Sequence, residues 1–248
     1  MATTKAPAKK PSLKKAVTKK PSPKKPVAKK PAPKKAVAKK PAVKKESVEI
    51  IAILDRSGSM AAQQAEVING YNHYIQKQKE LPGDAKASLT IFDHEITLVY
   101  GGIALPSVPA LDSSVYFTRG MTALNDAVGQ TLSAASARLK GKAKALVCII
   151  TDGQENASKE YTTKQIKKMI ADLEKKGWEF AFIGVGIDAF NEADAIGVAK
   201  VNARGVSSVH CVQSVGVSFD AMTVQSSEFR SHHAKKAPAK KPKPNNKA

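Results

Sequence analysis

The chain has 248 residues and a formal net charge of +20, and that charge is concentrated at the two ends. Residues 1–45 hold 17 lysines and residues 231–248 hold six, with no acidic residue in either segment, whereas the 185 residues between them hold 18 basic and 21 acidic side chains. This distribution excludes a uniformly basic protein. It predicts two cationic tails and a mildly acidic domain, residues 46–230, that is long enough to bury a core.

The sequence favours an intracellular protein. No stretch approaches the ~18 apolar residues of a membrane span, and the N-terminus lacks the apolar core of a signal peptide. The two cysteines, Cys148 and Cys211, each lie in an apolar run, which is typical of buried thiols in a reducing compartment. We therefore expect the protein in the cytoplasm, in association with a nucleoid or nucleus, or in a virion if its source is viral.

The N-terminal tail is a low-complexity repeat in which a lysine doublet recurs every five residues. Proline removes backbone donors, and the short side chains between the doublets offer too little apolar surface to offset the entropy of ordering. We expect residues 1–45 to be disordered, and also residues 231–248, which repeat the same composition. The doublets are Lys9, Lys10, Lys14, Lys15, Lys19, Lys20, Lys24, Lys25, Lys29, Lys30, Lys34, Lys35, Lys39, Lys40, Lys44 and Lys45.

These tails are suited to binding a polyanion. In an extended chain that rises about 3.1 Å per residue, a doublet recurs every ~15 Å, which allows the tail to follow a phosphate backbone. The tails contain no arginine and no Phe, Trp or Tyr, so we expect no reading of base sequence. In composition they resemble the Lys-Ala-Pro tails of linker histones and of histone-like bacterial and viral proteins. The alternatives are a solubilising spacer, contact with an anionic membrane surface, or a targeting role.

Strand and helix patterns alternate along the middle segment. The strand patterns are short runs rich in β-branched residues, and the helix patterns are apolar stripes that end at signals such as Pro82-Gly83. Because the strands are apolar on both faces, the sequence predicts a three-layer α/β fold with a mostly parallel central sheet flanked by helices. The expected elements are strands at 47–54, 145–153, 178–186 and 208–213, a hairpin at 87–101, and helices at 60–80, 124–139, 162–176, 189–196 and 219–229.

Two acidic residues directly follow predicted strands. Asp55 ends the run "ILD", and Asp152 lies in "ITDG". In open α/β sheets, ligands bind at the carboxyl ends of the strands, so these two residues are site candidates. Asp55 is followed by Ser57 and Ser59 in "DRSGSM", and the question is what chemistry one acid and two hydroxyls serve there.

Three alternatives to a metal site fit the sequence poorly. A P-loop needs Gly-Lys-Ser/Thr after a glycine-rich loop, and the sequence has no such string. A serine nucleophile needs a Gly-x-Ser-x-Gly turn and a histidine base, but Ser57-Gly58-Ser59 lacks the first glycine, and neither His94 nor His210 is obviously placed near this site. An aspartyl nucleophile at Asp55 would expect a second aspartate where Ser57 stands.

A metal site fits better, because hard divalent cations take oxygen ligands. Asp55, Ser57 and Ser59 offer one carboxylate and two hydroxyls in one turn. Further oxygen ligands are available from Thr122 in "RGMTALNDA" and from Asp152.

These three elements, in this order, resemble the metal-ion-dependent adhesion site of von Willebrand factor type A (VWA) domains across essentially all of residues 46–230. The strings "LDRSGSM", "RGMTAL" and "ITDGQENAS" look closest to intracellular bacterial and viral members. The resemblance implies that Ser57, Ser59 and Thr122 supply hydroxyls and that Asp55 and Asp152 bind directly or through water. The expected metal is Mg²⁺, with Mn²⁺ or Ca²⁺ as alternatives.

Such a site leaves one coordination position for water or for a carboxylate from another protein. We therefore expect a non-enzymatic adaptor that captures an acidic side chain of a partner, while its tails bind nucleic acid. Two alternatives stay open: a histone-like packaging protein whose domain is only structural, and a metal-dependent hydrolase. Near the site, we expect Asp126 to act as a hydrogen-bonding residue, Arg56 and Arg119 to be solvated charges, and Gly58 and Gly120 to serve turns.

Overall fold

The computed structural model of the protein describes residues 47–141, 143–186, 189–198, 208–212 and 214–234. The expectations for the lysine doublets and for nearly all of both tails lie outside these residues. So do those for the side chains of His210 and Cys211. Cys148, by contrast, is a buried free thiol as expected.

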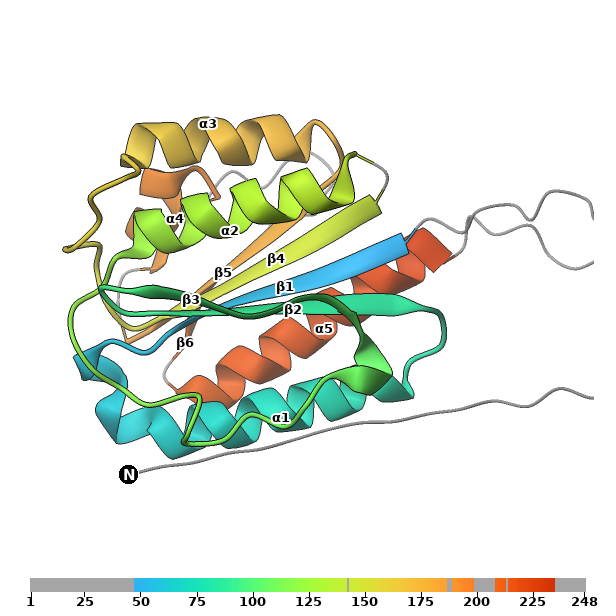
Figure 1. The fold of residues 1–248 in the computed structure, drawn as a ribbon, viewed down its shortest axis with the longest axis horizontal. Coiled ribbons are helices and arrows are strands. Elements are labelled where there is room, and N and C mark those ends of the chain that lie inside the picture. The colour runs from blue at the N-terminus through green and yellow to red at the C-terminus, as the bar shows by residue number, and fades with distance from the viewer. Residues whose placement is uncertain (1–46, 142, 187–188, 199–207, 213, 235–248) are drawn as a thin grey trace, which may run out of the picture. The chain divides into compact units, whose positions relative to one another are not determined.

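The described elements form a six-stranded sheet between two layers of helices, which confirms the predicted fold class (Figure 1). The strand order is β3-β2-β1-β4-β5-β6; β3 alone is antiparallel to its neighbour. The elements are β1 (Ser47–Asp55), a 3₁₀ turn η1 (Gly58–Gln63), α1 (Gln64–Glu80), β2 (Ala85–Phe92), β3 (Ile96–Ala104), η2 (Leu105–Ser107), α2 (Leu124–Leu139), β4 (Ala143–Thr151), α3 (Thr163–Glu174), β5 (Glu179–Val185), α4 (Ala189–Ile196), β6 (Ser208–Val212) and α5 (Val215–Ala234).

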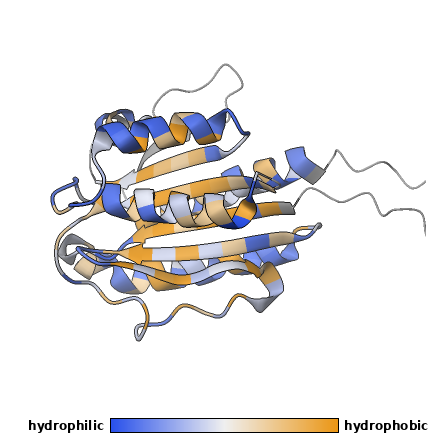
Figure 2. Cartoon of the chain, turned by 45° about the horizontal axis from the view of Figure 1, so that its top comes forward, coloured by the Kyte–Doolittle hydropathy of each residue, from blue (hydrophilic) through white to orange (hydrophobic). Residues whose placement is uncertain are grey.

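Both faces of the central strands β1, β4 and β5 are buried, as the apolar strand runs predicted, whereas the edge strand β3 is partly exposed. One core cluster lies under α1 and α5 and the other under α2, α3 and α4. The apolar character of the central strands is visible in Figure 2. Among the described helices, none is both long and apolar enough to cross a membrane.

The helix signals that depend on neighbouring residues in the chain are found in the structure as predicted. Thr162 caps α3 and forms the expected capping box with Gln165. The helix expected at 60–80 begins instead with the 3₁₀ turn η1, and its α-helical part starts at Gln64.

The last helix is longer than the sequence predicted. α5 spans Val215–Ala234 rather than 219–229, so its final residues occupy the start of the segment assigned to the C-terminal tail. Contacts with α1 support this length: Tyr74 and Ser226 are joined by a 2.8 Å hydrogen bond between hydroxyls, and the Arg230 guanidinium donates to the Gln78 and Gly83 carbonyls at 2.5 and 3.0 Å. These partners lie about 150 residues earlier in the chain, so no local pattern could reveal them.

Candidate metal centre

The predicted site lies where the carboxyl ends of β1 and β4 meet. These strands are parallel neighbours, with Leu54 in register with Ile150, so their last residues emerge side by side. The Thr151 hydroxyl donates to Asp55 Oδ2 at 2.5 Å. Asp55 is fully buried, and Asp152, the next residue after β4, is half-buried.

A chain of hydroxyls joins the two acids. The Ser57 amide donates to Asp55 Oδ1 at 2.7 Å, which closes the turn after β1. Ser57 Oγ lies 3.0 Å from Ser59 Oγ, and the Ser59 hydroxyl donates to Asp152 Oδ1 at 2.6 Å. The two serines therefore bridge the space between carboxylates that are 97 residues apart in sequence.

Thr122 reaches the same place from the loop before α2. Its hydroxyl lies close to Gly153, the residue after Asp152: a Cβ added to Gly153 would be 2.9 Å from Thr122 Oγ1 and 3.7 Å from Ser59 Oγ. The Thr122 backbone is held by Asn156, which accepts from its N–H at 2.9 Å and donates to its carbonyl at 3.0 Å. All five predicted ligands are thus brought together; we call Asp55, Ser57, Ser59, Thr122 and Asp152 the rim cluster.

Backbone hydrogen bonds hold the three loops of the rim against one another. The Gly58 amide donates to the Gly120 carbonyl at 3.1 Å, and the Arg119 amide donates to the Arg56 carbonyl at 2.9 Å. Gly120 has a φ of 65°, and a Cβ there would lie 2.0 Å from His94 Nδ1, so this position requires glycine. His94 therefore lies beside the rim loop, contrary to the expectation that no histidine is obviously placed near it.

A third acid at this edge was missed. Asp93 follows β2, is fully buried, and forms ion pairs with Arg56 at 3.0 Å and Arg119 at 2.8 Å. The expectation that Arg56 is solvated is wrong: it is only 3% exposed and stacks over Phe117, whereas Arg119 stays partly exposed. The string "TIFD" ends a strand in an acid just as "AILD" does, so the same signal could have identified Asp93.

Asp126 is a supporting residue, as expected. Its carboxylate accepts from the backbone amides of Lys159, Glu160 and Tyr161 at 2.7–2.9 Å. It therefore ties the start of α2 to the loop before α3. This loop also contains Asn156, which positions Thr122.

The electrostatics separate the rim cluster from Asp93. Within the described residues, neither Asp55 nor Asp152 forms an ion pair with a basic side chain, whereas Asp93 has two arginine partners. Burial raises the pKa of Asp55 from 3.8 to about 6, although hydrogen bonds from Thr151 and Ser57 lower it and the Asp152 charge raises it. Burial likewise raises the pKa of Asp152. Two desolvated carboxylates among neutral hydroxyls are a donor set that fits a hard divalent cation.

Comparisons with known proteins show the fold. No protein-family model matches the sequence, and no curated protein matches it. Manganese-loaded TRAP protein from Plasmodium vivax matches with a TM-score of 0.55 at 17% identity, over 75% of this chain and 74% of that one. A mutant of the PilB minor pilin from Streptococcus sanguinis matches with a TM-score of 0.54 at 11% identity, over 80% and 65%.

A third solved structure is proximal thread matrix protein 1 from the mussel byssus. It matches with a TM-score of 0.51 at 17% identity, over 74% of this chain but 46% of that one, so this chain spans about half of its length. The chain has a VWA-type α/β fold. In this VWA-type fold the rim cluster lies at the carboxyl ends of the central strands, where such sheets bind their ligands.

Proposed function

We propose that the chain is a non-enzymatic, intracellular adaptor whose VWA-type domain binds Mg²⁺ at the rim cluster and thereby captures an acidic side chain of a partner protein. The observation that carries this proposal is the pair of carboxylates, fully buried Asp55 and half-buried Asp152, connected by hydroxyls and without a basic partner among the described residues. The manganese-loaded state of the structurally similar TRAP protein supports a divalent cation here, with Mn²⁺ or Ca²⁺ as alternatives.

Each residue of the rim cluster has a role in this proposal. Asp55 and Asp152 balance the charge of the cation, directly or through water, while Ser57, Ser59 and Thr122 supply neutral oxygens. A bound cation provides an electrostatic anchor for an incoming carboxylate. The loops that carry these residues are already joined by backbone hydrogen bonds, so the ligands are largely positioned in advance.

The absence of catalysis is part of the proposal. The hydroxyls of Ser57 and Ser59 are engaged in the bridge between the acids, and His94 Nδ1 lies 3.3 Å from Asp93 rather than against a serine hydroxyl. The nucleic-acid role rests on composition alone: 23 lysines and no acid in the two tails. Such tails should bind duplexes without sequence preference and with a steep dependence on salt.

The first test is metal binding by the full chain. Mn²⁺ titration followed by electron paramagnetic resonance should show one site that is lost in Asp55→Asn. Asp84→Asn, which changes an exposed acid before β2, should bind as the wild type does. Equal binding in all three proteins would overturn the metal site.

The second test is capture of a partner. The full chain is immobilised and exposed to lysate from its source with Mg²⁺ or with EDTA, beside the same two variants. A protein retained only with Mg²⁺, and absent from Asp55→Asn, supports the adaptor. If Asp55→Asn leaves DNA binding unchanged and no protein is retained in a metal-dependent way, the packaging alternative is favoured. Substrate turnover abolished by Asp55→Asn favours the hydrolase.

A further inference from the structure

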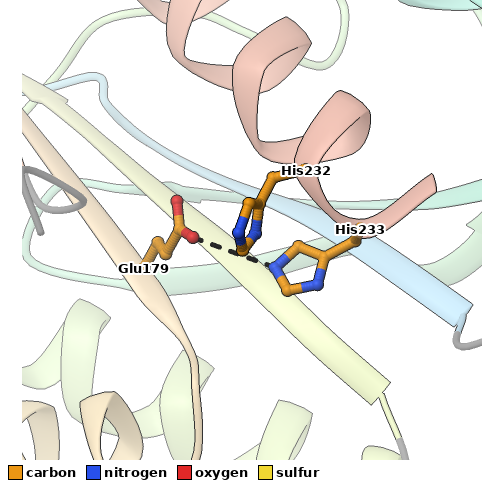
Figure 3. Close-up of side chains that lie close together, drawn as sticks. All are labelled: Glu179, His232 and His233. Atoms are coloured by element: carbon orange, nitrogen blue, oxygen red, sulfur yellow. Dashed lines mark ion pairs between the residues drawn. The ribbon is translucent and has the colours of Figure 1, made fainter. Parts of the chain in front are cut away.

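A second group of metal-ligating side chains lies at the opposite end of the sheet. Glu179 is the first residue of β5, and His232 and His233 lie in the last turn of α5 (Figure 3). Glu179 Oε1 is 3.8 Å from His233 Nε2, and one ligand atom from each residue lies within 4.8 Å of the other two. We call these three residues the amino-end cluster.

Contacts at both ends of α5 fix the position of its last turn, which carries His232 and His233. α5 starts near the beginning of α1, where the Gly216 amide donates to Glu66 at 2.9 Å, and it ends at the amino edge of the sheet. The Arg230 contacts with the end of α1 fix its last turns there. The ring of buried Phe229 packs against His233, with centroids 4.7 Å apart.

The surroundings favour a cation. Glu179 is largely buried, and the negative charge of Glu228 acts on it. Glu228 lies one helical turn before His232. The C-terminal end of α5 adds the negative end of its dipole, which attracts positive charge.

We propose that Glu179, His232 and His233 form a transition-metal site of the zinc class, distinct from the rim cluster. Three atoms within 4.8 Å of one another share a central point no more than about 2.8 Å from each, about 0.7 Å beyond the zinc–nitrogen distance of about 2.1 Å. His232 is exposed at the end of its helix, so its side chain has the freedom to close this difference.

The ligand types select the metal. Two imidazoles and one carboxylate suit Zn²⁺, Co²⁺, Ni²⁺ or Cu²⁺, whereas Mg²⁺ prefers an all-oxygen set such as the rim cluster. Two sites in one domain therefore differ in chemistry and need not compete. A bound metal would connect the end of α5 to β5 and stabilise the domain, because it binds the folded chain.

The experiment uses the full chain and zinc alone. Zinc affinity is measured by competition with a chromophoric chelator, and Co²⁺ is added separately as a probe of ligand geometry through its visible absorption. We expect one zinc site that persists in Asp55→Asn. We also expect His232→Ala to weaken zinc binding by at least about 30-fold, since it removes one of three protein ligands.

His73→Ala is the matched control, because His73 is also an exposed helical histidine but lies on α1, outside the cluster. Glu179→Gln should also lose zinc binding. If Glu179→Gln does not fold, the result for His232→Ala alone tests the site. His232 is exposed, so its replacement should leave thermal unfolding in EDTA unchanged. The proposed site would be overturned if His232→Ala and His73→Ala had the same zinc affinity and the same Co²⁺ spectrum.

Discussion

The two ends of the same sheet carry clusters of ionisable side chains that differ in chemistry and in origin. The rim cluster contains only oxygen donors, and its residues follow strands or lie in loops at the carboxyl edge. The amino-end cluster combines two imidazoles with one carboxylate, and it joins the start of a strand to the end of a helix. One fold thus positions the proposed hard-cation site by strand ends and the proposed zinc-class site by helix docking.

The comparison also shows which acidic side chains at the rim have a basic partner. Asp93 at the rim is balanced by Arg56 and Arg119, whereas Asp55 and Asp152 have hydroxyl partners. A buried acid with a basic partner needs no other cation. The acids that lack one among the described residues are the ones that a metal would stabilise.

The largest expected effect separates the two clusters. Asp55→Asn should weaken Mn²⁺ binding by at least about 100-fold, because it removes a negatively charged ligand, and should leave zinc binding unchanged. His232→Ala should weaken zinc binding by at least about 30-fold and leave Mn²⁺ binding unchanged. Titration of each variant with each metal measures this, and a variant that loses both metals equally would contradict the independence of the two sites.

The next effect concerns the anchoring of α5. Arg230→Ala should lower the free energy of unfolding by about 2–4 kcal/mol, because the carbonyls of Gln78 and Gly83 lose a buried charged donor. Urea denaturation in EDTA measures it, with exposed Lys77→Ala as the control, for which less than about 0.5 kcal/mol is expected. Mn²⁺ binding at the rim cluster should survive Arg230→Ala, whereas zinc binding should weaken.

A smaller effect appears in the pH dependence of the metal-free chain. The pKa of Asp55 in the folded state is about 6, above its ordinary value of 3.8, so folding favours the protonated carboxyl. The associated stability is fully present below about pH 4 and is lost as the pH rises through 6, by at most about 3 kcal/mol. Urea denaturation in EDTA at several pH values should show this loss in the wild type and a flatter profile in Asp55→Asn. Parallel profiles would contradict the prediction.

The smallest effect tests how closely the rim cluster is packed. In Gly153→Ala, the new Cβ would lie 2.9 Å from Thr122 Oγ1, so that hydroxyl must shift. We expect Mn²⁺ affinity to fall about tenfold with little change in stability. Gly58→Ala is the control inside the same site, since its Cβ would make only an ordinary 3.4 Å contact with the Gly120 carbonyl. Titration of both variants with Mn²⁺ compares them, and equal affinities would show that Thr122 is not a ligand.

Much of the rim cluster was predictable because it follows from local patterns. An apolar run that ends in an acid places that acid at the end of a strand, and parallel neighbours bring their ends together. Asp55 and Asp152 were found in this way, whereas Ser57, Ser59 and Thr122 were proposed from their place in polar turns and from the resemblance to VWA domains. The burial of Arg56 was not, because its partner Asp93 lies on another strand and its stacking partner Phe117 lies in a later loop.

The sequence by itself determined the order of strands and helices and the two acids, Asp55 and Asp152, that follow strands at the rim, because hydrophobic periodicity and strand ends are local properties. The tertiary structure decided the length of α5 and the meeting of Glu179 with His232 and His233. Those residues are more than 50 positions apart, and His232 and His233 had been assigned to a tail. They come together because α5 packs along α1, which places its last turn at the amino ends of the strands. This placement results from side-chain packing between segments that are distant in the chain.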